Sequence, residues 1–278
     1  MENNVLFVGG DRRIIYAAEY IGGKYPTVSL GLGEAEKPTG KYRYIVLPLP
    51  FSRDGICVNA PLSDEAIPLD VISEYADEGA VIFAGGSSLR LNDLCERSGA
   101  IAVDYFADEA LTLKNAALTA EAAVAMLIDN TEFSLCGAKV LITGYGRIAA
   151  YTARLLHVFG ADITICARKP DQRTKAALDL CEVAAMNMLA FYAESSDIII
   201  NTVPAALFGE SDFHKMNPDT IYMELATRKA VPEMDFAAAA GVRYISASGL
   251  PGKFCPKTAG IAIADTVMDY INKLENSI

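Results

Sequence analysis

The sequence has little positive charge for its size and no long apolar runs. Its 278 residues contain 24 lysines and arginines against 35 acids, which gives a net charge of −11. A protein of that charge repels nucleic-acid backbones and anionic lipid surfaces, so we expect neither as a partner. It contains no run of about 18 apolar residues, and we expect no transmembrane span. A small anionic ligand stays possible, because a local cluster of arginines or backbone N–H groups outweighs the overall charge nearby.

Paired cysteines and metal-ligand spacings are also missing. The six cysteines are scattered without a C-x-x-C pair, so neither a zinc site nor a thioredoxin-type motif is expected. No H-x-H or D-x-D spacing occurs, and we expect no metal site. The first residues lack a positive, apolar leader, and scattered cysteines are typical of reduced thiols, so we expect a cytoplasmic protein.

Only two histidines are present, which limits the available acid–base chemistry. His157 falls within an expected helix and His214 in a polar segment before Pro218, and we interpret both as structural or solvated. No Ser-His-Asp set can be assembled, and the late catalytic histidine usual in 2-hydroxy-acid dehydrogenases is missing.

What the chain does have is an alternation of short apolar runs with helical periodicity. Strands are expected at 5–9, 44–47, 80–84 and 101–103, and again at 139–143, 162–167, 197–201, 220–225 and 242–246. Helices are expected at 11–21, 67–76, 88–97, 119–131, 147–159, 171–180, 186–194, 232–240 and 257–274. This order predicts an α/β fold with two doubly wound parallel-sheet domains, the second a Rossmann NAD(P)-binding domain.

Two helices define the expected domain boundaries. The helix at 119–131 has Thr119 as a plausible N-cap and Glu121 in its first turn, and we interpret it as the bridge between domains. The last helix has one apolar face, so we expect it to return to the first domain. The prediction is a flavodoxin-like substrate domain at 1–118 plus 257–278, and an NADP-binding domain at 119–256.

A glycine motif marks the cofactor site. Gly144, Gly146 and Ala149 form a G-x-G-x-x-A pattern between an expected strand and an expected helix within residues 139–168. The first glycine permits a tight turn, and the second lets the backbone approach a pyrophosphate. The alternative is an ordinary strand–helix turn without a ligand. The predicted cofactor-binding residues of this loop are Gly144, Tyr145, Gly146, Arg147, Ile148 and Ala149.

The following strand favours NADP over NAD. An NAD site usually has an acid about 20 residues after the motif, whereas an arginine there suits a 2′-phosphate. Arg168 and Lys169 stand at the end of this strand, where no acid is found. We therefore predict NADP, with NAD possible; the alternative is a solvated basic pair at the start of a helix.

Two further strand ends belong to the predicted cofactor site. Residues 198–204 read IIINTVP and residues 224–228 read ELATR, and both lie where parallel strands border a dinucleotide. Asn201 is a candidate for contact with the ribose or nicotinamide. The predicted cofactor-binding residues at these ends are Thr202, Val203, Pro204 and Ala226.

Charged residues beside glycine and proline turns are the candidates for catalysis. Arg12 and Lys257 would hold substrate carboxylates, and Glu121 would move a proton. Asp11, Arg13 and Arg228 belong to the same set. Each alone is more often a helix cap or surface charge, but together they mark the expected cleft between the domains.

These blocks resemble the family of dipicolinate synthase A subunits over the whole chain. The similar segments, in order, are GGDRR, DYF at 104–106, NAALTAEAA at 115–123, GYGRIA, CARK, INTVPA, ELATR and SGLPGKFCPKTAG. The last of these is the most specific. The chain departs from the family tendency at Leu118 and Ala122, at residues 229–231, and at Lys253, which adds a charge.

The resemblance implies an N-terminal α/β domain, a joining helix, a Rossmann domain and a final helix that returns to the first domain. It further implies a nicotinamide-dependent protein that makes dipicolinate from a 4-hydroxy-tetrahydrodipicolinate precursor during sporulation, and its implied partner is a flavoprotein-like B subunit. The expected substrate is a small dicarboxylate, and an oligomer is expected. Two alternatives stay open: another NADP-dependent oxidoreductase of a small carboxylate, and a non-catalytic cofactor-binding subunit that docks such a partner.

Overall fold

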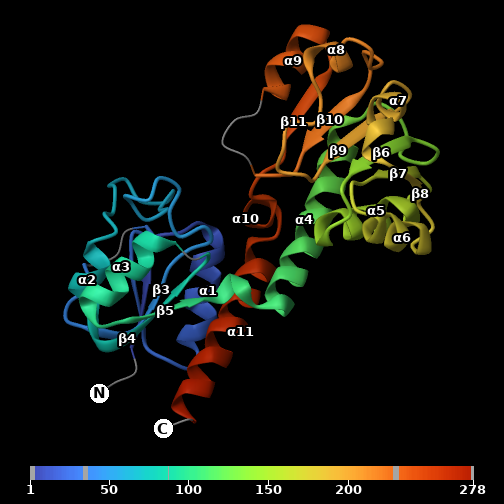
Figure 1. Ribbon diagram of the computed structural model, residues 1–278. Helices are drawn as coiled ribbons and strands as arrows, with labels where there is room; N and C mark the ends of the chain where they lie inside the picture. Colours follow the sequence, from blue (N-terminus) through green and yellow to red (C-terminus); the bar gives the residue numbers. More distant parts are fainter. Residues whose placement is uncertain (1–3, 34–36, 87, 228–231, 277–278) are drawn as a thin grey trace. The chain divides into compact units, whose positions relative to one another are not determined.

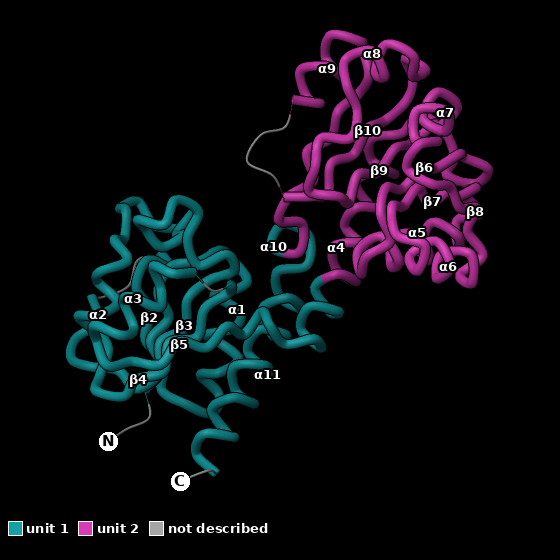
Figure 2. The backbone as a smooth tube through the Cα atoms, in the orientation of Figure 1, with its two compact units in different colours: residues 1–115, 252–278 teal, residues 116–251 magenta. Residues whose placement is uncertain are grey.

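The computed structural model describes residues 4–33, 37–86, 88–227 and 232–276. The chain divides into two compact units (Figures 1 and 2). The first comprises residues 1–115 and 252–278, and the second residues 116–251. Both boundaries fall a few residues before the expected ones.

The first unit contains a five-stranded parallel sheet in the order β2-β1-β3-β4-β5. The strands are β1 (Val5–Val8), β2 (Thr27–Leu30), β3 (Tyr42–Val46), β4 (Ala76–Ala84) and β5 (Ile101–Asp104). This is the flavodoxin-like strand order. Strand β2 was not among the expected strands, because its four residues TVSL are half-exposed at the sheet edge and form no apolar run.

Several helices and a 3₁₀ turn belong wholly to the first unit. They are α1 (Arg12–Gly22), α2 (Val71–Tyr75), α3 (Leu89–Ser98), the turn Tyr105–Ala107 and α11 (Pro256–Glu275). Helix α11 lies beside α1 (Figure 1). The two helices approach closely at Gly260, where a side chain would not fit. A Cβ at Gly260 would lie 2.3 Å from the carbonyl oxygen of Arg13. The expected return of the last helix to the first domain is therefore confirmed.

The second unit contains a six-stranded parallel sheet in the order β11-β10-β9-β6-β7-β8. The strands are β6 (Lys139–Thr143), β7 (Asp162–Cys166), β8 (Glu182–Ala184), β9 (Ile198–Asn201), β10 (Ile221–Glu224) and β11 (Arg243–Ser246). Counted from β6 as strand 1, this is the 3-2-1-4-5-6 order of a Rossmann domain, as expected. The short β8 was missed because only one of its three residues is buried.

Most helices of the second unit lie close to their expected positions. The helices of this unit are α5 (Arg147–Val158), α6 (Pro170–Leu178), α7 (Leu189–Ala193), α8 (Glu210–Phe213) and α9 (Glu233–Ala240), and α10 (Leu250–Phe254) crosses the boundary to the first unit. Residues 186–188 form a 3₁₀ turn before α7, so the expected helix at 186–194 is only partly α-helical. The short α8 and α10 show no periodicity in the sequence and were not expected.

The helix expected at 119–131 begins ten residues earlier than predicted. Helix α4 spans Glu109–Asn130, and the carboxylate of Asp108 accepts a hydrogen bond from the Leu111 N–H over 2.8 Å. Asp108 is thus the cap, and the prediction of Thr119 as N-cap is wrong. Thr119 is buried and Glu121 exposed in the interior of the helix. The alanine-rich sequence after Glu109 contains no helix breaker, so the helix continues through Thr119.

Helix α4 is also the one described helix that is long and apolar enough to cross a membrane by length and composition. Half of its most apolar 18-residue window is buried inside the protein. A core helix meets the same criterion, and buried alanines such as Ala120 and Ala123 account for the apolar composition here.

Candidate functional site

The glycine loop of the second unit lies at the carboxyl edge of its sheet. Gly144 has φ +77°, and its N–H donates to the carbonyl of Cys166 over 2.9 Å. A Cβ there would lie 2.9 Å from Val203 Cγ2, so the turn is tight against the end of β9. Gly146 caps α5 and has no neighbour within 4 Å of a Cβ position. This open N-terminus of a helix fits the pyrophosphate of a dinucleotide.

Tyr145 is buried within the second unit. Its hydroxyl donates to Asp179 Oδ2 over 2.5 Å, at the end of α6. Burial raises the pKa of Tyr145, and the bond to the carboxylate raises it further. The same bond, with Arg154 nearby, lowers the pKa of Asp179. The Tyr145 side chain therefore anchors the loop.

A buried polar network supports the strand ends behind the loop. The Thr143 hydroxyl donates to Asn201 Oδ1 over 2.6 Å. The Asn201 amide donates to both oxygens of Glu224, at 3.1 and 3.0 Å. These three residues pair across the last register positions of β6, β9 and β10, and all are buried. Thr143 and Glu224 were not among the predicted residues, although a polar residue ending each of three adjacent apolar strands is a signal that could have identified them.

The same network fixes the loops that follow the strands. Asn201 Oδ1 accepts from the N–H of Val203 over 3.0 Å, and Glu224 Oε1 accepts from that of Ala226 over 3.0 Å. The Thr202 hydroxyl donates to the carbonyl of Thr143 over 2.6 Å. The predicted residues Thr202 and Val203 thus lie beside Gly144, and the exposed Pro204 follows them; Ala226 follows β10, the next strand of the sheet.

Two cations stand at the end of the neighbouring strand. Arg168 and Lys169 are exposed after β7, and neither forms an ion pair with another described residue. The guanidinium of Arg173 donates to the carbonyls of Ala167 and Arg168, at 2.7 and 2.9 Å, and fixes the turn between them. The strand therefore ends in two exposed positive charges.

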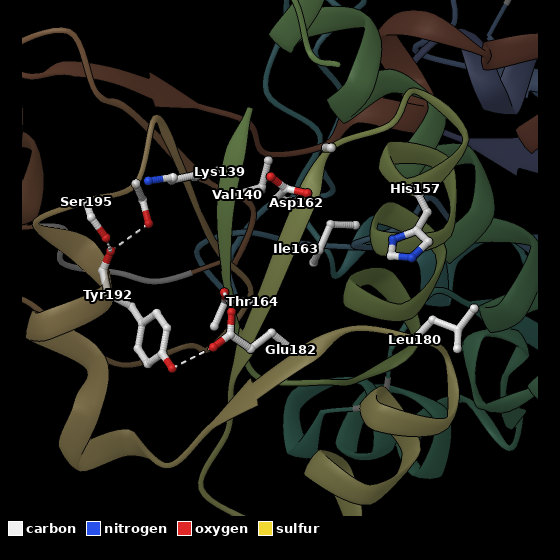
Figure 3. A pocket seen from close by; sticks show the side chains of 12 residues that line it. Lys139, Val140, His157, Asp162, Ile163, Thr164, Leu180, Glu182, Tyr192 and Ser195 are labelled. Atoms are coloured by element: carbon white, nitrogen blue, oxygen red, sulfur yellow. Dashed lines mark hydrogen bonds between the residues drawn. The ribbon is translucent and has the colours of Figure 1, made fainter. Parts of the chain in front are cut away.

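A cavity of about 530 Å³ opens at the opposite, amino edge of this sheet (Figure 3). Its lining includes His157, Asp162 and Glu182, and the Tyr192 hydroxyl donates to Glu182 Oε1 over 2.9 Å. None of the predicted cofactor residues lines it. Since parallel sheets bind cofactors at their carboxyl edge, this cavity is not the dinucleotide site.

In the first unit, a salt bridge between Asp11 and Arg13 stands at the start of α1. Asp11 caps α1, and its carboxylate accepts from Arg13 Nε and Nη2 at 2.9 and 2.8 Å. Arg13 Nη2 also donates to the carbonyl of Leu49 over 2.6 Å. A Cβ at Gly252 would lie 2.7 Å from Asp11 Oδ2. Asp11 and Arg13 are therefore structural.

Beside this pair lies a pocket of about 400 Å³ that contains two of the predicted catalytic residues. Arg12 comes from α1 and Lys257 from the first turn of α11, and Lys253 of α10 joins them. The remaining lining residues are Tyr16, Phe254, Cys255, Pro256 and Thr258. Glu121 belongs to the second unit and lines neither pocket. Arg228 lies outside the described residues.

Across the described part of the chain, no three histidine, cysteine or acidic side chains group closely enough to hold a metal ion. The two candidate sites are the glycine loop at the carboxyl edge of the sheet in the second unit and the cation-lined pocket of the first unit.

Two family models match the chain, one within each compact unit. Residues 4–106 match the N-terminal domain of the dipicolinate synthase A subunit, and residues 122–250 the NAD binding domain of D-isomer specific 2-hydroxyacid dehydrogenases. The chain is 25% identical to the dipicolinate synthase A subunit of Bacillus subtilis (strain 168) over 250 residues, which cover 86% of this chain and 81% of that protein.

Solved structures share the fold of the whole chain. The dipicolinate synthase A subunit from Bacillus halodurans superposes with a TM-score of 0.85 at 24% identity, covering 96% of this chain and 97% of that one. A transhydrogenase from Sinorhizobium meliloti superposes with a TM-score of 0.65 at 12% identity, covering 96% and 92%. The chain therefore shares the two-unit fold of these proteins.

Proposed function

We propose that this chain acts as a dipicolinate synthase A subunit, which its similarity to those proteins supports, and that it oxidises and dehydrates 4-hydroxy-tetrahydrodipicolinate to dipicolinate with NADP. The NAD-binding domain makes it a nicotinamide-dependent oxidoreductase of the dehydrogenase type. The substrate, the choice of NADP and a role in sporulation are the proposed part. The observation that carries the proposal is the carboxyl edge of the second sheet, where an open glycine loop lies beside a strand ending in two cations.

The choice of NADP rests on charge. Arg168 and Lys169 supply donors for a 2′-phosphate, and arginine binds phosphate through two parallel hydrogen bonds. The ribose-binding acid of NAD sites would stand at this strand end, and no acid is present there. Gly144, Gly146 and the N-terminus of α5 would hold the pyrophosphate, and Thr202, Val203, Pro204 and Ala226 would border the rest of the cofactor.

The proposed reaction does not need a strong acid or base. The substrate is a cyclic imine that loses one water and one hydride with a proton, and the product gains an aromatic ring. A bound nicotinamide would accept the hydride. The protein must orient the two carboxylates of the substrate and hold the ring C–H near the nicotinamide. Positioning residues can do this without a strong base. We assign carboxylate binding to Arg12 and Lys257, and proton transfer to Glu121.

The curated relative is an A subunit, which supports a partner subunit for this chain. We propose that it is a flavoprotein-like B subunit, that the two form an oligomer, and that both act in the cytoplasm. The test is turnover by the purified chain with NADP and the precursor, with and without that partner. NADPH formation with release of dipicolinate supports the proposal. Tight NADPH binding without turnover in either case would identify a non-catalytic cofactor-binding subunit instead.

A further inference from the structure

Three positive side chains converge on the pocket of the first unit. Arg12, Lys253 and Lys257 line it from α1, α10 and α11, and no carboxylate is among its lining residues. All three side chains are exposed. In a protein with a net charge of −11, three cations around about 400 Å³ of open space form a local field of the opposite sign.

No acidic side chain among the described residues balances these three cations. Arg90 and Arg97 pair with Asp70, and Lys114 pairs with Asp265. Arg12, Lys253 and Lys257 form no ion pair with any described residue. Three like charges placed together repel one another, and a bound anion relieves that repulsion.

The nearest acid does not neutralise the pocket. The Asp11 carboxylate lies against Gly252, but both of its oxygens accept hydrogen bonds from the buried Arg13. The pocket also includes the first turn of α11, a 20-residue helix with Pro256 in its opening turn. The partial positive charge of that helix end adds to the three side chains.

We propose that this pocket binds a small dicarboxylate through both of its carboxylates, and that Lys253 sets the preference for two carboxylates over one. Arg12 and Lys257 together balance the two negative charges, and Lys253 adds a third positive charge, whose attraction for a dianion is about twice its attraction for a monoanion. The identification of the ligand as the reaction's substrate rests on the proposed function. Lys253 is a specificity residue, because its loss weakens the binding of a dicarboxylate more than that of a monocarboxylate.

Direct binding to the full chain tests the proposal without turnover. The probes are pyridine-2,6-dicarboxylate, pyridine-2-carboxylate and inorganic phosphate, titrated calorimetrically. The parent is expected to bind the dicarboxylate about tenfold more tightly than the monocarboxylate, and Lys253→Gln is expected to lower that ratio to about threefold or less. Lys253→Arg should restore the ratio. The matched control is Lys41→Gln, an exposed lysine just before β3, which should leave the ratio at the parental value.

An unchanged ratio in Lys253→Gln, or a parental ratio near one, overturns the proposal. Phosphate binding as tight as dicarboxylate binding overturns the assigned ligand class. All substituted positions are exposed, so the substitutions should not unfold the protein. Melting temperatures equal to that of the parent would show that a changed binding ratio does not come from unfolding. Turnover of the precursor is measured on the same preparations. If the parent shows no turnover but Lys253→Gln lowers the binding ratio as expected, the proposed function is refuted and the dicarboxylate pocket stands. If the parent shows turnover but Lys253→Gln leaves the binding ratio unchanged, the role of Lys253 is refuted and the proposed function stands.

Discussion

The hydroxyl of Thr143 donates a 2.6 Å hydrogen bond to the side-chain oxygen of Asn201 and joins the carboxyl ends of β6 and β9. The bond is buried, and it positions the same amide that donates to Glu224. Loss of a buried donor costs about 1–3 kcal/mol. Thr143→Val should therefore lower the free energy of unfolding by about that amount and weaken NADPH binding, as measured by denaturant unfolding and fluorescence titration.

Thr152 provides the matched control for this change. It is equally buried on α5, but its hydroxyl has no hydrogen-bond partner in the described part of the chain. Thr152→Val removes an unsatisfied polar group and keeps the shape, so it should be neutral or slightly stabilising. Equal losses of stability in the two variants would show that the Thr143–Asn201 bond contributes nothing.

Gly144 and Gly137 separate backbone strain from close contact at the glycine loop. Their φ angles are +77° and +78°, so an alanine is similarly strained at either, by about 1–2 kcal/mol. Only at position 144 would the new Cβ meet a neighbour, Val203 Cγ2 at 2.9 Å. Gly144→Ala should thus lower the melting temperature more than Gly137→Ala and weaken NADPH binding at least tenfold. Matching losses of affinity would contradict the role assigned to the turn.

Much of the fold could be predicted from sequence because the core strands are continuous apolar runs. The runs at 139–143 and 198–201 are buried strands in register with one another. The edge strands β2 and β8 gave no such signal, since their burial depends on neighbours that are distant in sequence. The start of α4 was misplaced because Thr119 matches a cap pattern locally, whereas Asp108 caps the helix that tertiary packing extends.

The candidate site was predictable to a lesser extent. The G-x-G-x-x-A spacing identified the loop. Arg168 could be placed at the same edge of the sheet because it follows the next strand of the βαβ unit. The inward Tyr145 side chain and the Thr143–Asn201–Glu224 network depend on pairing between strands that local patterns do not define. The convergence of Arg12 with Lys257 likewise follows from the packing of α11 on α1, across most of the chain.

The bond between Tyr145 and Asp179 predicts a pH-dependent stability. The pKa of Asp179 is lowered, so its contribution is present above the usual 3.8 and is lost as the pH falls through the folded value. The pKa of Tyr145 is raised, so its contribution is complete below 10.0 and is lost as the pH rises through the folded value. Tyr145→Phe should cost about 1 kcal/mol between these limits and less outside them, as measured by urea unfolding across pH. Tyr192→Phe, which removes an exposed bond to Glu182, is the control and should have little effect at neutral pH.

Lys257 should be required for turnover and dispensable for cofactor binding. It is exposed in the first turn of α11, in the pocket of the first unit, so its loss removes no buried contact. Lys257→Ala, assayed with precursor and the partner subunit, should lower kcat/KM about tenfold or more while NADPH affinity and melting temperature stay at the parental values. Lys114→Ala, whose lysine pairs with Asp265 of α11, is the control and should keep its turnover. Undiminished turnover in Lys257→Ala would remove this residue from the site.

Arg168 should determine the choice between the two nicotinamide cofactors. Its side chain is exposed at the end of β7, and the backbone around it is held by Arg173, so Arg168→Ala changes charge without disturbing the turn. A hydrogen bond to a charged group contributes about 1.5–3 kcal/mol, which corresponds to roughly a ten- to hundredfold change in affinity. The Kd for NADPH should rise by that factor in Arg168→Ala, while the Kd for NADH changes by less than about threefold, because NADH lacks the 2′-phosphate. Lys175→Ala on α6 controls for the general loss of a cation and should alter neither value appreciably. Equal affinities for the two cofactors in the parent would refute the preference, and an equal loss of both in Arg168→Ala would assign the arginine to the shared pyrophosphate instead.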